Sequence, residues 1–207
     1  MNVAADPCLF LSFVETLDEH DLDHPIKRFP PRNDTDVMAE WERPLTYLWE
    51  LAELWHVEPL IAVLKSRQML MTWLFLALYT WDPTYHIGRR IFLQSKKEED
   101  AKELLNRQKG ILKRLPDCIR PRYRTTSTRI HFYEHDSEIR AMAQGADQVR
   151  SYTFSGGYCD EAAFQDRFEE SFGACLPTIE GGGRLSVVST AAPSFFMSLH
   201  SDEIGRH

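Results

Sequence analysis

The sequence predicts a three-layer α/β protein in which helices cover both faces of a mostly parallel central sheet. Two observations lead to this prediction. Short apolar runs suited to buried strands recur along the chain, and stretches with helical spacing of their apolar residues separate them. This alternation favours a parallel sheet, because a crossover helix must connect successive parallel strands. The 207 residues suffice for one such domain with a terminal arm.

The composition excludes several classes of protein. It is 43% hydrophobic and 27% charged, as in ordinary globular proteins, and its four cysteines contain no C-x-x-C pair of a zinc ribbon. The formal net charge of −7 argues against a wholly basic nucleic-acid wrapper but allows a local positive channel. The longest apolar stretch, residues 69–79, is too short to span a bilayer, and the N-terminus lacks the form of a signal peptide. We therefore expect a cytoplasmic protein without a membrane partner.

The sequence pattern of the first third of the chain predicts an arm followed by a helix. Residues 1–35 contain prolines and an acidic stretch without a sustained period, which indicates an N-terminal arm before a domain over residues 36–207. Within that domain, apolar residues recur at intervals of three or four over residues 36–54, predicting a helix. Pro44 is expected to kink or split it.

Two strand-and-helix pairs follow. Residues 61–64 form a short apolar run that suits a strand buried on both faces of a parallel sheet. Helical spacing resumes at about Thr72. A second run, residues 91–93, precedes a charged amphipathic helix, for which Ser95 is the expected cap and Leu115 the approximate end.

The last third predicts more strands and one helix. Residues 129–143 alternate, which indicates a pair of strands with a hairpin around Asp136. Residues 152–159 form a further strand, weakened by two glycines. A helix over residues 162–172 and a buried strand over residues 185–188 complete the pattern.

The segment between the first predicted strand and its helix is a candidate phosphate loop. Its sequence is Lys65-Ser66-Arg67-Gln68-Met69-Leu70-Met71-Thr72. Backbone N–H groups at a helix N-terminus favour anions at this place. Thr72 matches the last position of G-x-x-x-x-G-K-[ST], but Leu70 replaces the second glycine and Met71 replaces the lysine. Lys65 and Arg67 bring two cations to the loop, which either meet the phosphate charge or are simply solvated at a strand end.

Two further polar groups follow predicted strands. Asp160 and Glu161 come after a strand, where P-loop ATPases place one carboxylate on Mg²⁺ and the next on the attacking water. The alternative is an acidic pair that favours the dipole of a following helix. Ser189 and Thr190 bring two hydroxyls to the strand edge at which open α/β sheets bind ligands, unless they are plain turn residues.

In these segments the chain resembles the ATPase domain of the large terminase subunit of tailed bacteriophages, the motor that packages DNA into procapsids. The resemblance covers roughly residues 61–193. The segments that carry it are the deviant Walker A loop at 65–72, the approach to Walker B at 144–152, the acidic end of that strand at 160–164, and the coupling motif at 189–191.

The resemblance implies a P-loop NTPase fold with ATP and Mg²⁺ as cofactors. The residues it assigns to the nucleotide are Lys65, Ser66, Arg67, Gln68, Met69, Met71, Thr72, Ser189 and Thr190. It implies that Thr72 and Asp160 hold Mg²⁺ and that Glu161 is the catalytic carboxylate. Arg150 matches the family arginine that acts as a finger on the neighbouring subunit's nucleotide; an ordinary surface arginine is the alternative.

The implied partners are double-stranded DNA, a portal protein and a small terminase subunit, with a homo-oligomeric ring as the active form in the host cell cytoplasm. The C-terminal nuclease domain of the family is absent from the predicted organisation, so we expect no nuclease activity. Two other functions stay open. One is a helicase-like P-loop ATPase, and the other is a degenerate nucleotide-binding assembly module without hydrolysis, which Leu70 and Met71 favour.

Two further patterns have less specific interpretations. His131, Glu134 and His135 fit the zinc motif H-x-x-E-H, but the surrounding alternation predicts a strand, which does not hold the histidines in helical register. The stretch from Arg107 to Arg129 is rich in basic residues, which either face DNA phosphates or form a solvated surface.

Overall fold

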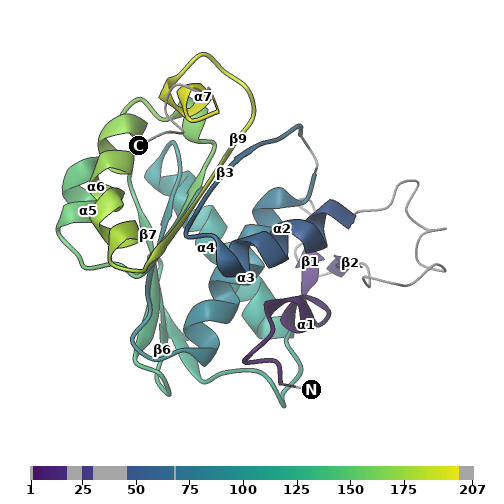
Figure 1. The fold of residues 1–207 in the computed structure, drawn as a ribbon. Coiled ribbons are helices and arrows are strands. Elements are labelled where there is room, and N and C mark those ends of the chain that lie inside the picture. The colour runs from purple at the N-terminus through teal and green to yellow at the C-terminus, as the bar shows by residue number, and fades with distance from the viewer. Residues whose placement is uncertain (1, 18–24, 30–45, 68, 201–207) are drawn as a thin grey trace.

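The computed structural model describes residues 2–17, 25–29, 46–67 and 69–200. Within these residues, a seven-stranded sheet forms the central layer (Figure 1). In chain order its strands are β3 (Leu60–Leu64), β4 (Arg90–Gln94), β5 (Tyr123–Thr125), β6 (Arg129–Phe132), β7 (Ser137–Met142), β8 (Gly156–Asp160) and β9 (Arg184–Ser189). Across the sheet they lie in the order β3-β9-β8-β4-β7-β6-β5. The first five strands in this order pair in parallel, whereas β6 pairs antiparallel with both of its neighbours, β7 and β5.

Helices cover both faces of this sheet (Figure 1). One face carries α3 (Met71–Tyr85) and α4 (Glu98–Arg114), and the other carries α5 (Ala146–Arg150) and α6 (Phe168–Glu180). Each face has its own cluster of buried apolar side chains between sheet and helices. The predicted three-layer α/β fold with a mostly parallel sheet is therefore confirmed.

The described N-terminal residues pack on the α3 side. Their elements are α1 (Pro7–Leu11), β1 (Glu15–Leu17), β2 (Pro25–Arg28) and α2 (Thr46–Val57). The side chain of Asp6 starts α1 by accepting hydrogen bonds from the backbone N–H groups of Cys8 and Leu9. Phe10 and Trp55 are buried in the same cluster as α3. The division into an arm over residues 1–35 and a domain over residues 36–207 stays a prediction.

Helix α3 is buried around its whole circumference, from Trp73 to Thr84. A helix that is apolar on every side must be covered on every side. The sheet, α1, α2 and α4 provide that cover. None of the described helices is long and apolar enough to cross a bilayer.

Strand β3 lies at the edge of the sheet, so the expectation that residues 61–64 are buried on both faces is wrong. Its pairing partner among the described residues is β9, and Ile61 is the one buried residue of the strand. Leu60 and Leu64 are 39% and 45% exposed. The apolar run is typical of an interior strand, but its place in the sheet depends on the topology.

The start of α4 also differs from the expectation. Lys97 is the N-cap residue and makes no side-chain capping hydrogen bond, so the predicted cap at Ser95 is wrong. Ser95 is buried directly after β4. The predicted end at about Leu115 is confirmed, because Leu115 is the C-cap.

The helix predicted over residues 162–172 is divided in two. A 3₁₀ turn, η2 (Ala162–Phe164), ends at Gln165, whose backbone is extended, and α6 begins at Phe168. The Gln165 amide donates a hydrogen bond to the carbonyl of Asp160, which holds the break in place. Residues 152–155 precede β8 as a loop, which shortens the predicted strand.

The predicted hairpin is confirmed, with β6 and β7 joined by a turn in which Asp136 has a φ of 45°. An unpredicted strand, β5, pairs with β6. Its three residues are too few to show a clear alternation. For helix α2, the described part begins at Thr46, and the rest of the helix predicted over residues 36–54 lies outside the described residues.

Gly157 in β8 is required by close packing. An added Cβ would overlap the ring of Phe92 on β4. We expect Gly157→Ala to lower the free energy of unfolding by about 3 kcal/mol, because the core must shift to relieve the clash. Gly173 of α6 is the control: a Cβ there meets no atom within 4 Å, and alanine should raise stability by up to about 1 kcal/mol through helix propensity. Chemical denaturation measures both, and equal effects would contradict the packing argument.

Candidate active site

The polar groups predicted from separate segments meet at one edge of the sheet. Strand β9 lies between β3 and β8, and all three are parallel, so their C-terminal ends are adjacent. Lys65 follows β3, Asp160 ends β8 and Ser189 ends β9. Helix α3 begins at the same edge, and its residue Thr72 contacts Asp160. Open α/β sheets bind ligands at this edge.

Asp160 is a buried carboxylate held by two hydroxyls. The Thr72 hydroxyl donates to its Oδ1 at 3.4 Å, and the Tyr158 hydroxyl donates to the same oxygen at 2.8 Å. Burial raises the pKa of Asp160 above its ordinary value, and the hydrogen bond from Tyr158 offsets only part of that effect. The negative charge of Asp160 is therefore incompletely compensated.

Glu161 is held from both of its carboxylate oxygens. Lys65 Nζ lies 2.9 Å from Oε1, and the Thr190 hydroxyl donates to Oε2 at 3.2 Å. The Ser189 hydroxyl lies 3.4 Å from Oε2. Burial acts to raise the pKa of Glu161, but the ion pair with Lys65 and the Thr190 contacts outweigh it and lower the pKa. Glu161 is therefore ionised at neutral pH.

The backbone of Glu161 adopts the left-handed conformation, with φ 50° and ψ 46°. Such a conformation costs on the order of 1 kcal/mol for a residue other than glycine and is concentrated at functional sites. Here it lies between the end of β8 and η2, next to the carboxylate contacts just described.

The loop before α3 also contains a left-handed residue. Leu70 is the N-cap of α3 with a φ of 54°, a conformation that glycine adopts without steric cost. Met71 is buried, with 7% of its surface exposed, whereas Ser66 and Arg67 are exposed. The Met69 carbonyl accepts a hydrogen bond from the Tyr47 hydroxyl. Gln68 lies outside the described residues.

A cavity of about 400 Å³ opens beside the acidic pair. Its charged lining residues are the carboxylates Asp100, Glu103, Asp160 and Glu161 and the cations Arg67, Lys96 and Arg107. Arg107 belongs to the basic stretch interpreted as a DNA-facing or solvated surface, and instead it lines this cavity and lies over the ring of Trp73. The cavity thus contains carboxylates that can bind a cation and cationic side chains that can bind a polyanion.

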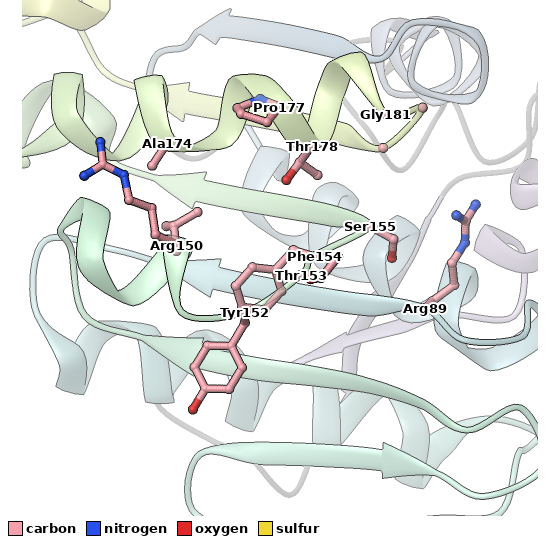
Figure 2. A pocket seen from close by; sticks show the side chains of 13 residues that line it. Arg89, Arg150, Tyr152, Thr153, Phe154, Ser155, Ala174, Pro177, Thr178 and Gly181 are labelled. Carbon is pink, nitrogen blue, oxygen red and sulfur yellow. The ribbon is translucent and has the colours of Figure 1, made fainter.

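Arg150 lies apart from this cavity. It is the last residue of α5 and lines a second cavity of about 470 Å³ between α6 and the loop before β8 (Figure 2). The linings of the two cavities have no residue in common. Arg150 therefore does not join the acidic pair of its own chain in the described structure.

The sequence reasoning missed three residues of the site: Tyr158, Gln165 and Lys96. Tyr158 lies two residues before Asp160 in β8, so both side chains point to the same face of the sheet. That spacing is a signal that could have identified it. Gln165 and Lys96 carry no comparable signal, because their positions depend on the packing of loops.

No protein-family model matches this sequence. Among solved structures, it is similar to the ATPase domain of the Thermus phage P74-26 large terminase, with a TM-score of 0.59 and 17% identity over 82% of this chain and 74% of that one. It is similar to the HK97 bacteriophage large terminase, with a TM-score of 0.61 and 15% identity. The chain has the fold of a large-terminase ATPase domain.

The predicted P-loop NTPase fold is thereby confirmed. The match to the HK97 large terminase covers 93% of this chain but 38% of that chain. A large terminase from the thermophilic bacteriophage D6E, solved in complex with ADP, matches with a TM-score of 0.51 and 13% identity over 70% of this chain and 37% of that one. At these identities the likeness to the terminases concerns the fold.

Proposed function

We propose that this domain binds Mg²⁺-ATP and hydrolyses it as the motor of a viral DNA-packaging terminase. The proposal rests on two sets of contacts at one edge of the sheet. Thr72 contacts Asp160, and Lys65 and Thr190 contact Glu161. These pairs come from segments far apart in the sequence. The ADP complex of a terminase with this fold supports nucleotide as the ligand.

The residues present fit Mg²⁺ as the metal. Mg²⁺ takes oxygen ligands, usually one or two from the protein, with phosphates and waters completing the set. Thr72 and Asp160 offer a hydroxyl and a carboxylate oxygen 3.4 Å apart. A cation would compensate the buried charge of Asp160, whose pKa is raised by burial. Bound Mg²⁺ would neutralise charge on the phosphates during transfer.

Lys65 and Glu161 have complementary roles in this mechanism. Lys65 neutralises Glu161 in the structure. When Lys65 turns to phosphate oxygens, Oε1 of Glu161 becomes free to orient water and to accept its proton. Thr190 keeps the other carboxylate oxygen in place. The ion pair therefore links nucleotide binding to the availability of the general base.

The remaining assignments extend the same proposal. Backbone N–H groups at the start of α3, with Ser66, Gln68, Met69 and Met71 of the loop, cradle the phosphates, and Arg67 adds a cation. Ser189 and Thr190, which contact Glu161, sense the γ-phosphate. Arg150 acts on the nucleotide of the neighbouring subunit in a homo-oligomeric ring, whose partners are double-stranded DNA, a portal protein and a small terminase subunit.

The first test is ATP binding and hydrolysis by the wild-type chain. We expect calorimetry to detect ATP binding in MgCl₂, and phosphate release to stop when EDTA removes the metal. Because Arg150 acts in trans, the rate per subunit should rise with protein concentration, and Arg150→Ala should remove that rise. Absence of binding at millimolar ATP would contradict the proposal.

A second candidate function is a nucleotide-binding assembly module that does not hydrolyse ATP. The buried side chain of Met71 at the position of the Walker lysine favours it, as does the leucine at a backbone position suited to glycine. This module would bind ATP in calorimetry and release no phosphate at any protein concentration.

A further inference from the structure

One face of the sheet beyond β4 carries a group of arginines. In β6, Ile130 and Phe132 are buried in the cluster that includes α3, and the alternation of the strand turns Arg129 and His131 to the opposite face. The side chains of Arg129 and His131 are 42% and 28% exposed, and Arg124 of β5 is exposed. The helices on that side therefore leave this part of the sheet open to solvent.

The strand register gathers further arginines on this face. In one row across the sheet, Arg124 pairs with His131, His131 with Glu138, and Glu138 with Arg90. In the next row, Arg129 of β6 pairs with Arg140 of β7. We refer to Arg90, Arg124, Arg129 and Arg140 as the arginine face.

Two carboxylates accompany these four guanidinium groups. Glu138 is nearly buried and accepts a hydrogen bond from Arg140 at 2.6 Å and one from Arg129 at 3.3 Å. Asp136 pairs with Arg90 at 2.9 Å. The arginine face thus keeps two positive charges in excess, on a chain whose net charge is −7. Glu138 also fixes the guanidinium groups, which lowers the entropy that they lose on binding an anion.

A groove of about 390 Å³ lies beside Arg129 and Arg140, two of the four residues of the arginine face. Its lining consists of Thr126, Thr128, Arg129, Arg140, Ala141, Met142 and Tyr152. The set contains two arginines, two threonine hydroxyls and an aromatic ring, and no acidic residue. Tyr152 is 47% exposed, and its side chain extends away from Pro177 and Thr178 of α6 (Figure 2). The Arg140 guanidinium lies 4.6 Å from the centre of its ring.

We propose that the arginine face binds the phosphate backbone of a polynucleotide. Guanidinium groups and hydroxyls are the side-chain groups that contact nucleic-acid phosphates, and an exposed tyrosine offers a stacking surface for an unpaired base. The choice of polynucleotide over other polyanions rests on the proposed DNA-translocating function. Single strands and duplexes both present phosphates to such a surface, and the experiment below distinguishes the two ligands.

The test is fluorescence anisotropy of the full chain with labelled oligothymidylate and with a labelled duplex, across a range of salt concentrations and without ATP. The variant is the double substitution Arg124→Gln and Arg129→Gln, which preserves the hydrogen bond from Arg140 to Glu138. We expect affinity to fall by about tenfold, and the slope of log affinity against log salt to weaken by about 1.4 for single strands or 1.8 for duplex. The charge-matched control, Lys102→Gln with Lys113→Gln on α4, should bind like wild type.

The outcomes separate this surface from the proposed function. Equal affinities and salt slopes for wild type and the Arg124/Arg129 variant would overturn the assignment, provided that thermal melting shows both folded. If the ligand is a single strand, an unpaired base stacks on Tyr152. Tyr152→Leu should then weaken oligothymidylate binding by about tenfold and leave duplex binding unchanged. If the chain binds DNA through the arginine face but does not bind ATP, the polynucleotide-binding surface is supported and the proposed ATPase function is contradicted.

Discussion

Glu161→Gln should reduce the rate of ATP hydrolysis by a factor of about 10²–10⁴, the usual contribution of a general base. The amide keeps the size of the side chain but cannot accept a proton from water. Lys65 and Thr190 lower the pKa of Glu161, so the wild-type carboxylate is ionised at neutral pH. ATP affinity should not fall, because loss of the ion pair frees Lys65 for the phosphates. Phosphate release and calorimetry measure the two quantities.

The matched control for this prediction is Glu169→Gln, which removes an exposed carboxylate on α6 outside the cavity. It should hydrolyse ATP at the wild-type rate. If Glu161→Gln hydrolysed ATP as fast as wild type, Glu161 would not be the base. If both variants were slow, the effect would come from the overall charge of the protein.

Lys65→Met should weaken ATP binding by about tenfold or more, since charge-assisted contacts to phosphate are the strong ones. Met71 occupies the place of the Walker lysine and is buried, so Lys65 is the lysine of this loop that reaches the acidic pair. Its loss also removes the ion pair that lowers the pKa of Glu161. Titration calorimetry with ATP and MgCl₂ measures the affinity.

A rescue variant tests whether Lys65 replaces the missing Walker lysine. Adding Leu70→Gly and Met71→Lys to Lys65→Met restores the glycine at a left-handed position and a lysine at the start of α3. This triple variant should recover most of the lost affinity. Lys102→Met, a lysine on α4 outside the cavity, is the control and should bind ATP like wild type. Unchanged ATP affinity in Lys65→Met would refute the assignment.

Local patterns predicted the strands and helices that support the site, because apolar periodicity directly reflects which face of an element is buried. The acidic pair was predicted in the same way, from its position after an apolar run. The start of α6 was less accurate, because Gln165 breaks the helix through a contact with Asp160 that no local pattern encodes. The predicted cap at Ser95 was wrong for a related reason: Ser95 is buried directly after β4, and α4 begins only after its N-cap residue Lys97.

The sequence by itself determined the alternation of strands and helices, and with it the placing of Lys65, Asp160, Glu161 and Ser189 at strand ends. The tertiary structure alone decided that β9 lies between β3 and β8, which brings Lys65 within 2.9 Å of Glu161 across 96 positions. It also decided the edge position of β3, the left-handed backbone of Leu70 and the row of arginines across β5, β6 and β7. The physical reason is that strand order and register arise from packing between distant segments, whereas periodicity records only the burial of each segment on its own.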